Sequence, residues 1–234
     1  MKKFFYLLFL LFPVCISAQD LHLAIGPSFS LLKYTSTYTI LSTIDNKSFT
    51  GFNVMAGVDY LKLKYFNLSS ELGFIQKGGK DSVMATDAEG YGIARMWCTT
   101  KLNFLTVNST ANLRIPFKGY IYPYAFLGPR LDYLTGYTEN VDLVSQFDAV
   151  KKLNKLIYGV IIGAGIDFKV KKFLLSIVFD YYFNLDRLVY YHYELPPDCC
   201  SKSDKSVNIT SDDIFYKLID RTFTINARIG YIFK

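Results

Sequence analysis

The sequence predicts an all-β protein, an eight-stranded antiparallel up-and-down transmembrane β-barrel. Apolar and polar residues alternate over stretches that are about as long as the 9 to 11 residues of a tilted strand that crosses a bilayer. The gaps between these stretches are alternately short and long. The chain also has 19 tyrosines, 20 phenylalanines and 51% hydrophobic residues. Yet beyond residue 18 it contains no continuous apolar run of the length of a spanning helix. A barrel explains this composition because its apolar face is divided among many strands.

The first 18 residues have the pattern of a secretory signal peptide. Lys2 and Lys3 give the positive start, residues 4–12 are apolar, and cleavage between Ala18 and Gln19 follows the small residues Ser17 and Ala18. A membrane-anchor helix and a lipoprotein anchor at Cys15 are the alternatives. We therefore expect a signal peptide at 1–18, a single barrel domain at 19–234, and export.

The charge of the chain is moderate. The net charge of +6 includes Lys2 and Lys3, and the remainder does not indicate a nucleic-acid partner. Three cysteines remain after the predicted cleavage site, Cys98, Cys199 and Cys200, and this odd number argues against a disulfide framework. We expect no cofactor and no metal site.

The first four predicted strands are 21–33, 50–61, 67–77 and 97–115. In the first, the apolar face consists of Leu21, Leu23, Ile25, Pro27, Phe29 and Leu31. In the second, it consists of Phe52, Val54, Ala56, Val58 and Tyr60. The third is weaker, with Leu68, Leu72 and Phe74, and the fourth has Leu105, Val107, Ala111 and Leu113. Successive strand residues point to opposite faces, so each stretch has one apolar and one polar side.

The last four predicted strands are 120–133, 156–168, 173–183 and 222–233. Their apolar faces are Ile121, Ala125, Leu127 and Leu131; then Tyr158, Val160, Ile162, Ala164 and Ile166. The seventh strand has Leu175, Ile177, Phe179 and Tyr181, and the eighth has Phe223, Ile225, Ala227, Ile229, Tyr231 and Phe233. Pro27 and Pro129 lie inside strands and cannot donate to a ladder, so we expect a bulge or bend at each.

The lengths of the gaps favour a membrane barrel over a soluble one. The gaps 62–66, 116–119 and 169–172 are short, whereas 34–49, 78–96, 134–155 and 184–219 are long. Strict alternation of this kind is typical of outer-membrane barrels, with short periplasmic turns and long outer loops. A soluble lipocalin-like carrier, the alternative, gives no reason for it. The short turns contain Lys62, Lys64, Lys118, Lys169, Lys171 and Lys172.

With the apolar faces on lipid, eight charged side chains are predicted to line the lumen as a polar network. Buried charges must pair, because an isolated ion in a low dielectric is very costly. We expect these charges to plug a barrel that is just wide enough for its own side chains, and the alternative is a narrow or gated channel. They are Asp59, Glu71, Arg114, Arg130, Asp132, Asp167, Asp180 and Arg228.

We predict no enzymatic activity. A rim-located hydrolase would need His192 to work with Glu194, Asp186 or Asp212, and no catalytic motif supports that arrangement. The long gap 184–219 is instead the candidate for an outward-facing binding surface. Its aromatic patch consists of Tyr190, Tyr191, His192 and Tyr193.

Six short segments have the pattern of a known family: the signal end 17–19, Ala24–Ser30, Gly51–Val58, Leu113–Pro116, Tyr122–Pro129 and the terminal Arg228–Phe233. Through them the sequence resembles the PorT-like outer-membrane β-barrel proteins of Bacteroidetes-type bacteria. The resemblance implies an eight-stranded barrel in the outer membrane and, for one branch, an accessory role in protein secretion. The expected partners are outer-membrane lipid, the barrel assembly machinery and an unidentified secretion or surface partner; we expect a monomer.

Overall fold

The structure is a computed structural model that describes residues 20–36, 45–86, 92–115, 117, 120–141, 150–185, 189–192 and 216–233. These residues form ten strands: β1 (Asp20–Ser36), β2 (Asp45–Lys62), β3 (Phe66–Thr86), β4 (Gly92–Arg114), β5 (Ile121–Val141), β6 (Val150–Leu153), β7 (Leu156–Val170), β8 (Phe173–Asn184), β9 (Val189–His192) and β10 (Tyr216–Ile232). Within them, no helix is long and apolar enough to cross a membrane.

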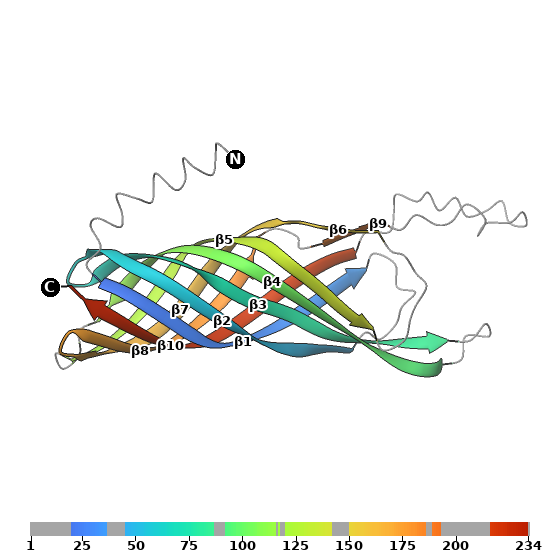
Figure 1. The fold of residues 1–234 in the computed structure, drawn as a ribbon, viewed down its shortest axis with the longest axis horizontal. Helices are drawn as coiled ribbons and strands as arrows, with labels where there is room; N and C mark the ends of the chain where they lie inside the picture. The colour runs from blue at the N-terminus through green and yellow to red at the C-terminus, as the bar shows by residue number, and fades with distance from the viewer. Residues whose placement is uncertain are drawn as a thin grey trace, which may run out of the picture.

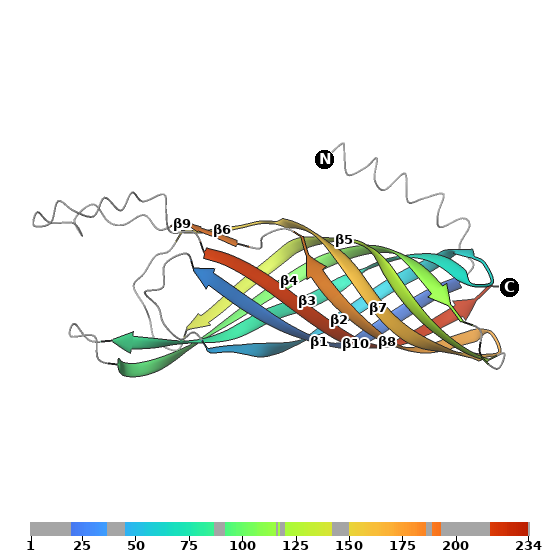
Figure 2. The same ribbon diagram turned by 180° about the vertical axis from the view of Figure 1, so that it is seen from behind.

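Eight of the strands close into a barrel. β1, β2, β3, β4, β5, β7, β8 and β10 pair antiparallel in that order, and β10 pairs back onto β1 from Asp20↔Ile232 to Ser36↔Tyr216. Figures 1 and 2 show the tilted strands wrapped into one cylinder. The predicted eight-stranded antiparallel barrel is confirmed.

The apolar faces point outward. Leu21 and Ile25 on β1 are 53% and 57% exposed, and Leu113 on β4 is 62% exposed. Neighbouring strands place outer aromatic rings together, as where Phe223 lies between Phe29 and Phe179 at centroid distances of 6.4 and 6.2 Å. A lipocalin-like carrier requires these faces inside, so that alternative is wrong.

The strands differ from the prediction mainly at the end with the long connections. The predicted loop 78–96 is largely the hairpin of β3 and β4, which stay paired as far as Ala85↔Ala94 and Thr86↔Gly92. Backbone hydrogen bonds hold such a ladder without apolar alternation, which is needed only where one face meets lipid. The hairpin projects beyond the barrel at the end away from the C-terminus (Figure 1).

The strands β6 and β9 were not predicted. They pair with each other from Val150↔His192 to Leu153↔Val189, and β9 joins β10 through Tyr190↔Lys217. Both lie outside the closed cylinder, within the predicted loops 134–155 and 184–219.

Of the bulge or bend expected at Pro27 and at Pro129, the bulge is wrong. The β1–β10 register is the same on both sides of Pro27, at Ile25↔Ala227 and Ser28↔Thr224, and the β4–β5 register is likewise unchanged across Pro129. A glycine precedes each proline. A Cβ on Gly26 would lie 1.9 Å from the carbonyl oxygen of Ile225, so the missing side chain lets the neighbouring strand stay close. Register shifts occur elsewhere, for example between Asp59 and Leu61.

Candidate functional site

The interior of the barrel is the candidate site because it gathers the charged side chains. The eight residues predicted to form the lumen network all point inward. Seven of them are at most 8% exposed, and the side chain of Arg228 is 10% exposed. Each engages another interior group through an ion pair or hydrogen bond, and most fall into two clusters.

The first cluster, here the Lys77 cluster, consists of Lys77, Arg130, Asp132 and Asp220. Lys77 Nζ donates to Asp132 Oδ2 at 2.9 Å and to Asp220 Oδ2 at 3.0 Å. Arg130 Nε lies 3.1 Å from Asp132 Oδ1. Two cations thus face two anions, so the cluster balances its own charge. Neutral donors complete it, with Thr106 bonded to Asp132 and Thr222 and Asn184 bonded to Asp220.

Aromatic and aliphatic side chains seal the Lys77 cluster. Lys77 Nζ lies 5.2 Å from the ring centroid of Phe104 and 5.4 Å from that of Tyr182, and Arg130 stacks on Tyr182 at 4.7 Å. Such cation–π contacts gain strength when water is excluded. Around them lies a buried apolar core, here the lumen core, in which six members are fully buried: Leu32, Ile75, Leu102, Phe104, Ile157 and Val178.

The second cluster, here the His22 cluster, lies nearer the short turns. Glu71 Oε1 accepts from Arg228 Nη2 at 2.6 Å and contacts His22 Nε2 at 2.9 Å. On its other side, Arg114 Nη2 lies 3.0 Å from Asp167 Oδ2 and 3.5 Å from Asp59 Oδ2. Its members are His22, Asp59, Glu71, Arg114, Asp167 and Arg228.

Asp180 stands between the two clusters and is held by neutral donors. Its Oδ2 accepts from Thr224 Oγ1 at 2.9 Å and from Asn226 Nδ2 at 2.6 Å. Hydrogen bonds of this kind satisfy a buried carboxylate without a cation in contact. The predicted network is therefore a chain of polar groups along the lumen, with most ionic contacts concentrated at two levels.

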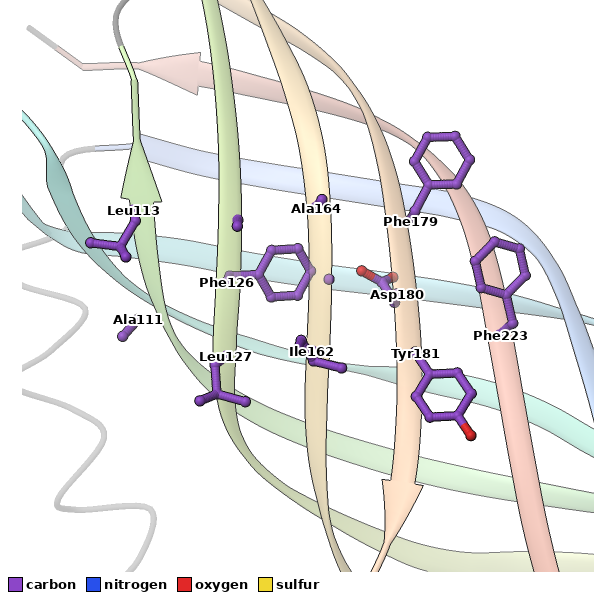
Figure 3. A pocket seen from close by; sticks show the side chains of 12 residues that line it. Ala111, Leu113, Phe126, Leu127, Ile162, Ala164, Phe179, Asp180, Tyr181 and Phe223 are labelled. Atoms are coloured by element: carbon purple, nitrogen blue, oxygen red, sulfur yellow. The ribbon is translucent and has the colours of Figure 1, made fainter.

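Glycines on β7 make room for the side chains that fill the lumen. Phe126 on β5 is the register partner of Gly163, and Tyr124 is the partner of Gly165. A Cβ on Gly163 would lie 2.2 Å from Phe126 Cζ, so the ring occupies the space of the missing side chain. Figure 3 shows Phe126 reaching from β5 toward β7. The interior is thus packed by large residues laid over glycines.

The outer face has a shallow apolar hollow of about 530 Å³ over β4, β5, β7, β8 and β10 (Figure 3). It arises because Ala125 and Ala164 are register partners among larger neighbours such as Leu113 and Phe179. The hollow faces the surroundings of the barrel, and its outward-facing lining offers no acid–base pair.

Several predicted residues lie outside these clusters. Tyr190, Tyr191 and His192 lie on β9, where His192 pairs with Val150 and Tyr191 with Lys151. Tyr193, the hydrolase partners Asp186, Glu194 and Asp212, and the cleavage residues Ala18 and Gln19 lie outside the described residues. Among the residues that are described, no group of three or more His, Cys, Asp or Glu side chains could hold a metal ion.

His22, Lys77 and Asp220 also belong to the interior and were not predicted there. Each was close to the end of a predicted strand, where the alternation was not followed further. Lys77 has the same parity as Glu71, and Asp220 has the same parity as Arg228. The alternation within the predicted strands 21–33 and 67–77 already places His22 and Lys77 inward, and extending strand 222–233 by two residues places Asp220 inward as well.

Comparison with known proteins gives one family. The family model described as "Outer membrane protein beta-barrel domain" matches residues 17–189 of this chain. No curated protein matches the chain.

Similar solved structures include three outer-membrane or surface proteins. OprG from Pseudomonas aeruginosa is 12% identical, with 92% of this chain and 97% of that one covered and a TM-score of 0.48. Neisserial surface protein A is 12% identical, with 90% of this chain and 97% of that one covered and a TM-score of 0.41. Ail of Yersinia pestis, solved in complex with a heparin analogue, is 13% identical, with coverages of 91% and 98% and a TM-score of 0.37.

Proposed function

Because this chain belongs to the outer membrane protein beta-barrel domain family, we propose that it is a non-enzymatic barrel that anchors a β-sheet platform at the cell surface for a partner. The family indicates the outer membrane as its location. The platform is the part of the sheet that continues past the closed cylinder, namely 45–48 of β2, 78–86 of β3, 92–101 of β4 and 134–141 of β5.

The observation that carries the proposal is that β2, β3, β4 and β5 continue outward as one paired sheet beyond the ladders that join them to β1 and β7. β1 and β10 also continue, paired with each other, to Ser36↔Tyr216. The pairing of β1 with β2 ends at Ser30↔Phe49, and that of β5 with β7 ends at Tyr133↔Leu156. Beyond those pairs, β2 stays paired with β3 as far as Asp45↔Ser82, and β4 with β5 as far as Cys98↔Val141. In this stretch the register shifts once in each of these two ladders, between Ser48 and Asn53 and between Asn103 and Phe104. A hydrogen-bonded sheet presents side chains in fixed positions, as recognition requires.

The packing of the lumen supports an anchor over a conduit. The Lys77 cluster balances its own charge, and the lumen core surrounds it with fully buried aliphatic side chains. Side chains of an eight-stranded barrel are enough to fill its interior. A narrow or gated channel remains the second candidate, and its signature is measurable conductance.

The resemblance to PorT-like proteins suggests which partner binds. We propose that the partner belongs to a secretion machinery and that it contacts the barrel at the platform. The barrel itself is a monomer surrounded by outer-membrane lipid, delivered by a signal peptide at 1–18 and inserted by the assembly machinery.

The proposal is tested by complementation. Cells that lack this protein are given a variant, and the recovery of protein secretion is measured. One variant replaces residues 80–99 with Asn-Gly, which shortens the hairpin at the partners Gly79 and Thr100. A matched control, Lys155→Gln, changes an exposed side chain at the same end of the barrel and leaves the platform intact. We expect the shortened barrel to migrate as a folded, heat-modifiable species and to fail in complementation, while the control complements. Full complementation by the shortened barrel would contradict the proposal.

A further inference from the structure

The two ends of the barrel differ in charge. The short connections 62–66, 116–119 and 169–172 contain six lysines and no acidic residue. The long connections 34–49, 78–96, 134–155 and 184–219 contain 13 acidic and 10 basic residues. One end is thus positive without local compensation, and the other is mixed.

Four of the six lysines have described side chains, and all four are exposed. We call Lys64, Lys169, Lys171 and Lys172 the basic rim. Acidic side chains at the same level point into the lumen and are buried, with Asp20 at 1%, Asp59 at 3% and Asp167 at 0% exposure. Because these carboxylates are buried, they do not neutralise the exposed ammonium groups of the rim at the surface.

Aromatic rings surround the barrel beside the basic rim. Tyr231 contacts Phe173 and Phe233 at centroid distances of 5.7 and 5.4 Å, and Lys64 Nζ lies 5.0 Å from the ring centroid of Tyr65. These rings are exposed, as are Phe117 and Tyr120. A girdle of aromatic residues marks the boundary between hydrocarbon and headgroups. The turns at this end are short (Figure 2), and the aromatic girdle beside them places the rim at the headgroup level.

Lys171 occupies a backbone position that suits another residue type. It lies in the two-residue turn between the partners Val170 and Phe173 and has a φ of 56°. Glycine, asparagine and aspartate adopt such conformations at lower cost than lysine. Local exceptions of this kind are expected at functional or strained sites. Here that side chain adds positive charge at the membrane boundary.

We propose that the basic rim binds the phosphate headgroups of anionic phospholipids in the inner leaflet of the outer membrane. Short turns face the periplasm in barrels of this class, so the inner leaflet is the surface within reach. Lysine stems lie along apolar surface while their ammonium groups reach the phosphates. Lys64 lies in the β2–β3 turn and the other three lysines lie at the β7–β8 turn, so the rim offers charge on two sides of the barrel. Basic side chains beside a membrane surface attract anionic headgroups within about a Debye length.

The test uses the full chain folded into phosphatidylcholine bilayers with trace spin-labelled lipids. The measurement is the association of labelled phosphatidylglycerol with the barrel relative to labelled phosphatidylcholine. We expect a several-fold preference for phosphatidylglycerol that K64Q/K169Q/K171Q/K172Q reduces to about onefold and that 1 M salt abolishes. The control K47Q/K80Q/K101Q/K155Q removes as many charges from the other end and keeps the preference.

A second variant separates lipid binding from folding. Lys171→Gly relieves the backbone strain, so we expect its unfolding midpoint to rise while its preference for phosphatidylglycerol falls. The proposal is overturned if the wild type shows no preference or if the four-lysine variant retains it. It is also overturned if the rim lysines are required instead for co-sedimentation with purified peptidoglycan.

Discussion

Lys77 and Asp220 are 143 positions apart in the chain, and Lys77 Nζ donates to Asp220 Oδ2 at 3.0 Å inside the barrel. Both residues are buried, and the same ammonium group also contacts Asp132. The contact joins β3 to β10 across the lumen. It can form only when the cylinder is closed, so it reports on the complete fold.

Replacing Lys77 with methionine should strongly destabilise the barrel. Methionine keeps much of the volume but leaves Asp132 and Asp220 buried with one cation fewer, and breaking a buried pair costs about 3 to 5 kcal/mol. Urea unfolding of the protein in lipid vesicles measures the change in free energy. Lys80→Met, on the exposed side of the same strand, is the control and should cost little. An unchanged midpoint for Lys77→Met would contradict the role of the cluster.

The pair of Arg228 and Glu71 should show strong energetic coupling. Their atoms are 2.6 Å apart within the His22 cluster. Arg228→Met alone leaves the Glu71 carboxylate with His22, while the double variant with Glu71→Gln removes both charges. We expect the double variant to be more stable than the sum of the single effects predicts, by about 0.5 to 3 kcal/mol. Additive effects in a double-mutant cycle would contradict the pairing.

Gly163 should not tolerate a larger side chain while Phe126 is present. A Cβ at Gly163 would lie 2.2 Å from Phe126 Cζ. We expect Gly163→Val to destabilise by about 1 to 3 kcal/mol through overpacking. Adding Phe126→Ala should restore part of the loss, because it removes the contact with the ring. The backbone oxygen of Phe179, 2.4 Å from the added Cβ, stays in place, so the rescue is incomplete. If the second substitution makes the first worse, the ring does not occupy that space.

Gly26→Ala should destabilise the β1–β10 seam. The added Cβ would lie 1.9 Å from the carbonyl oxygen of Ile225, which belongs to the backbone and cannot rotate away. Gly230→Ala is the matched control on the other strand of the same seam, because its nearest neighbour is 3.4 Å from the added atom. We expect a lower folded fraction in heat-modifiable migration for Gly26→Ala alone. Equal behaviour of the two variants would contradict the close approach.

The alternation of residues in the sequence was enough to predict the barrel and the direction of its faces. Leu21, Leu23 and Ile25 point outward, as expected from their two-residue period. That signal depends on lipid against one face. It ends where the strands leave the lipid, which is why the ladder from Gly79↔Thr100 to Thr86↔Gly92 was mistaken for a loop.

The candidate site was predictable in its members more than in its pairings. Inward parity identified Asp132 and Arg130, but partners such as Lys77 and Asp220 come from strands far apart in the chain. Which inward residues meet depends on the register and stagger of the whole barrel. The packing of Phe126 over Gly163 has the same origin, since both residues were on predicted strands and only the β5–β7 register shows that they are partners.

Single-channel recording in planar bilayers tests the central claim most directly, namely that the interior of the barrel is closed by its own side chains. The folded wild-type protein should show no sustained conductance, because the Lys77 cluster and the lumen core fill the path. Stable, reproducible conductance steps from the folded wild-type protein would contradict the account.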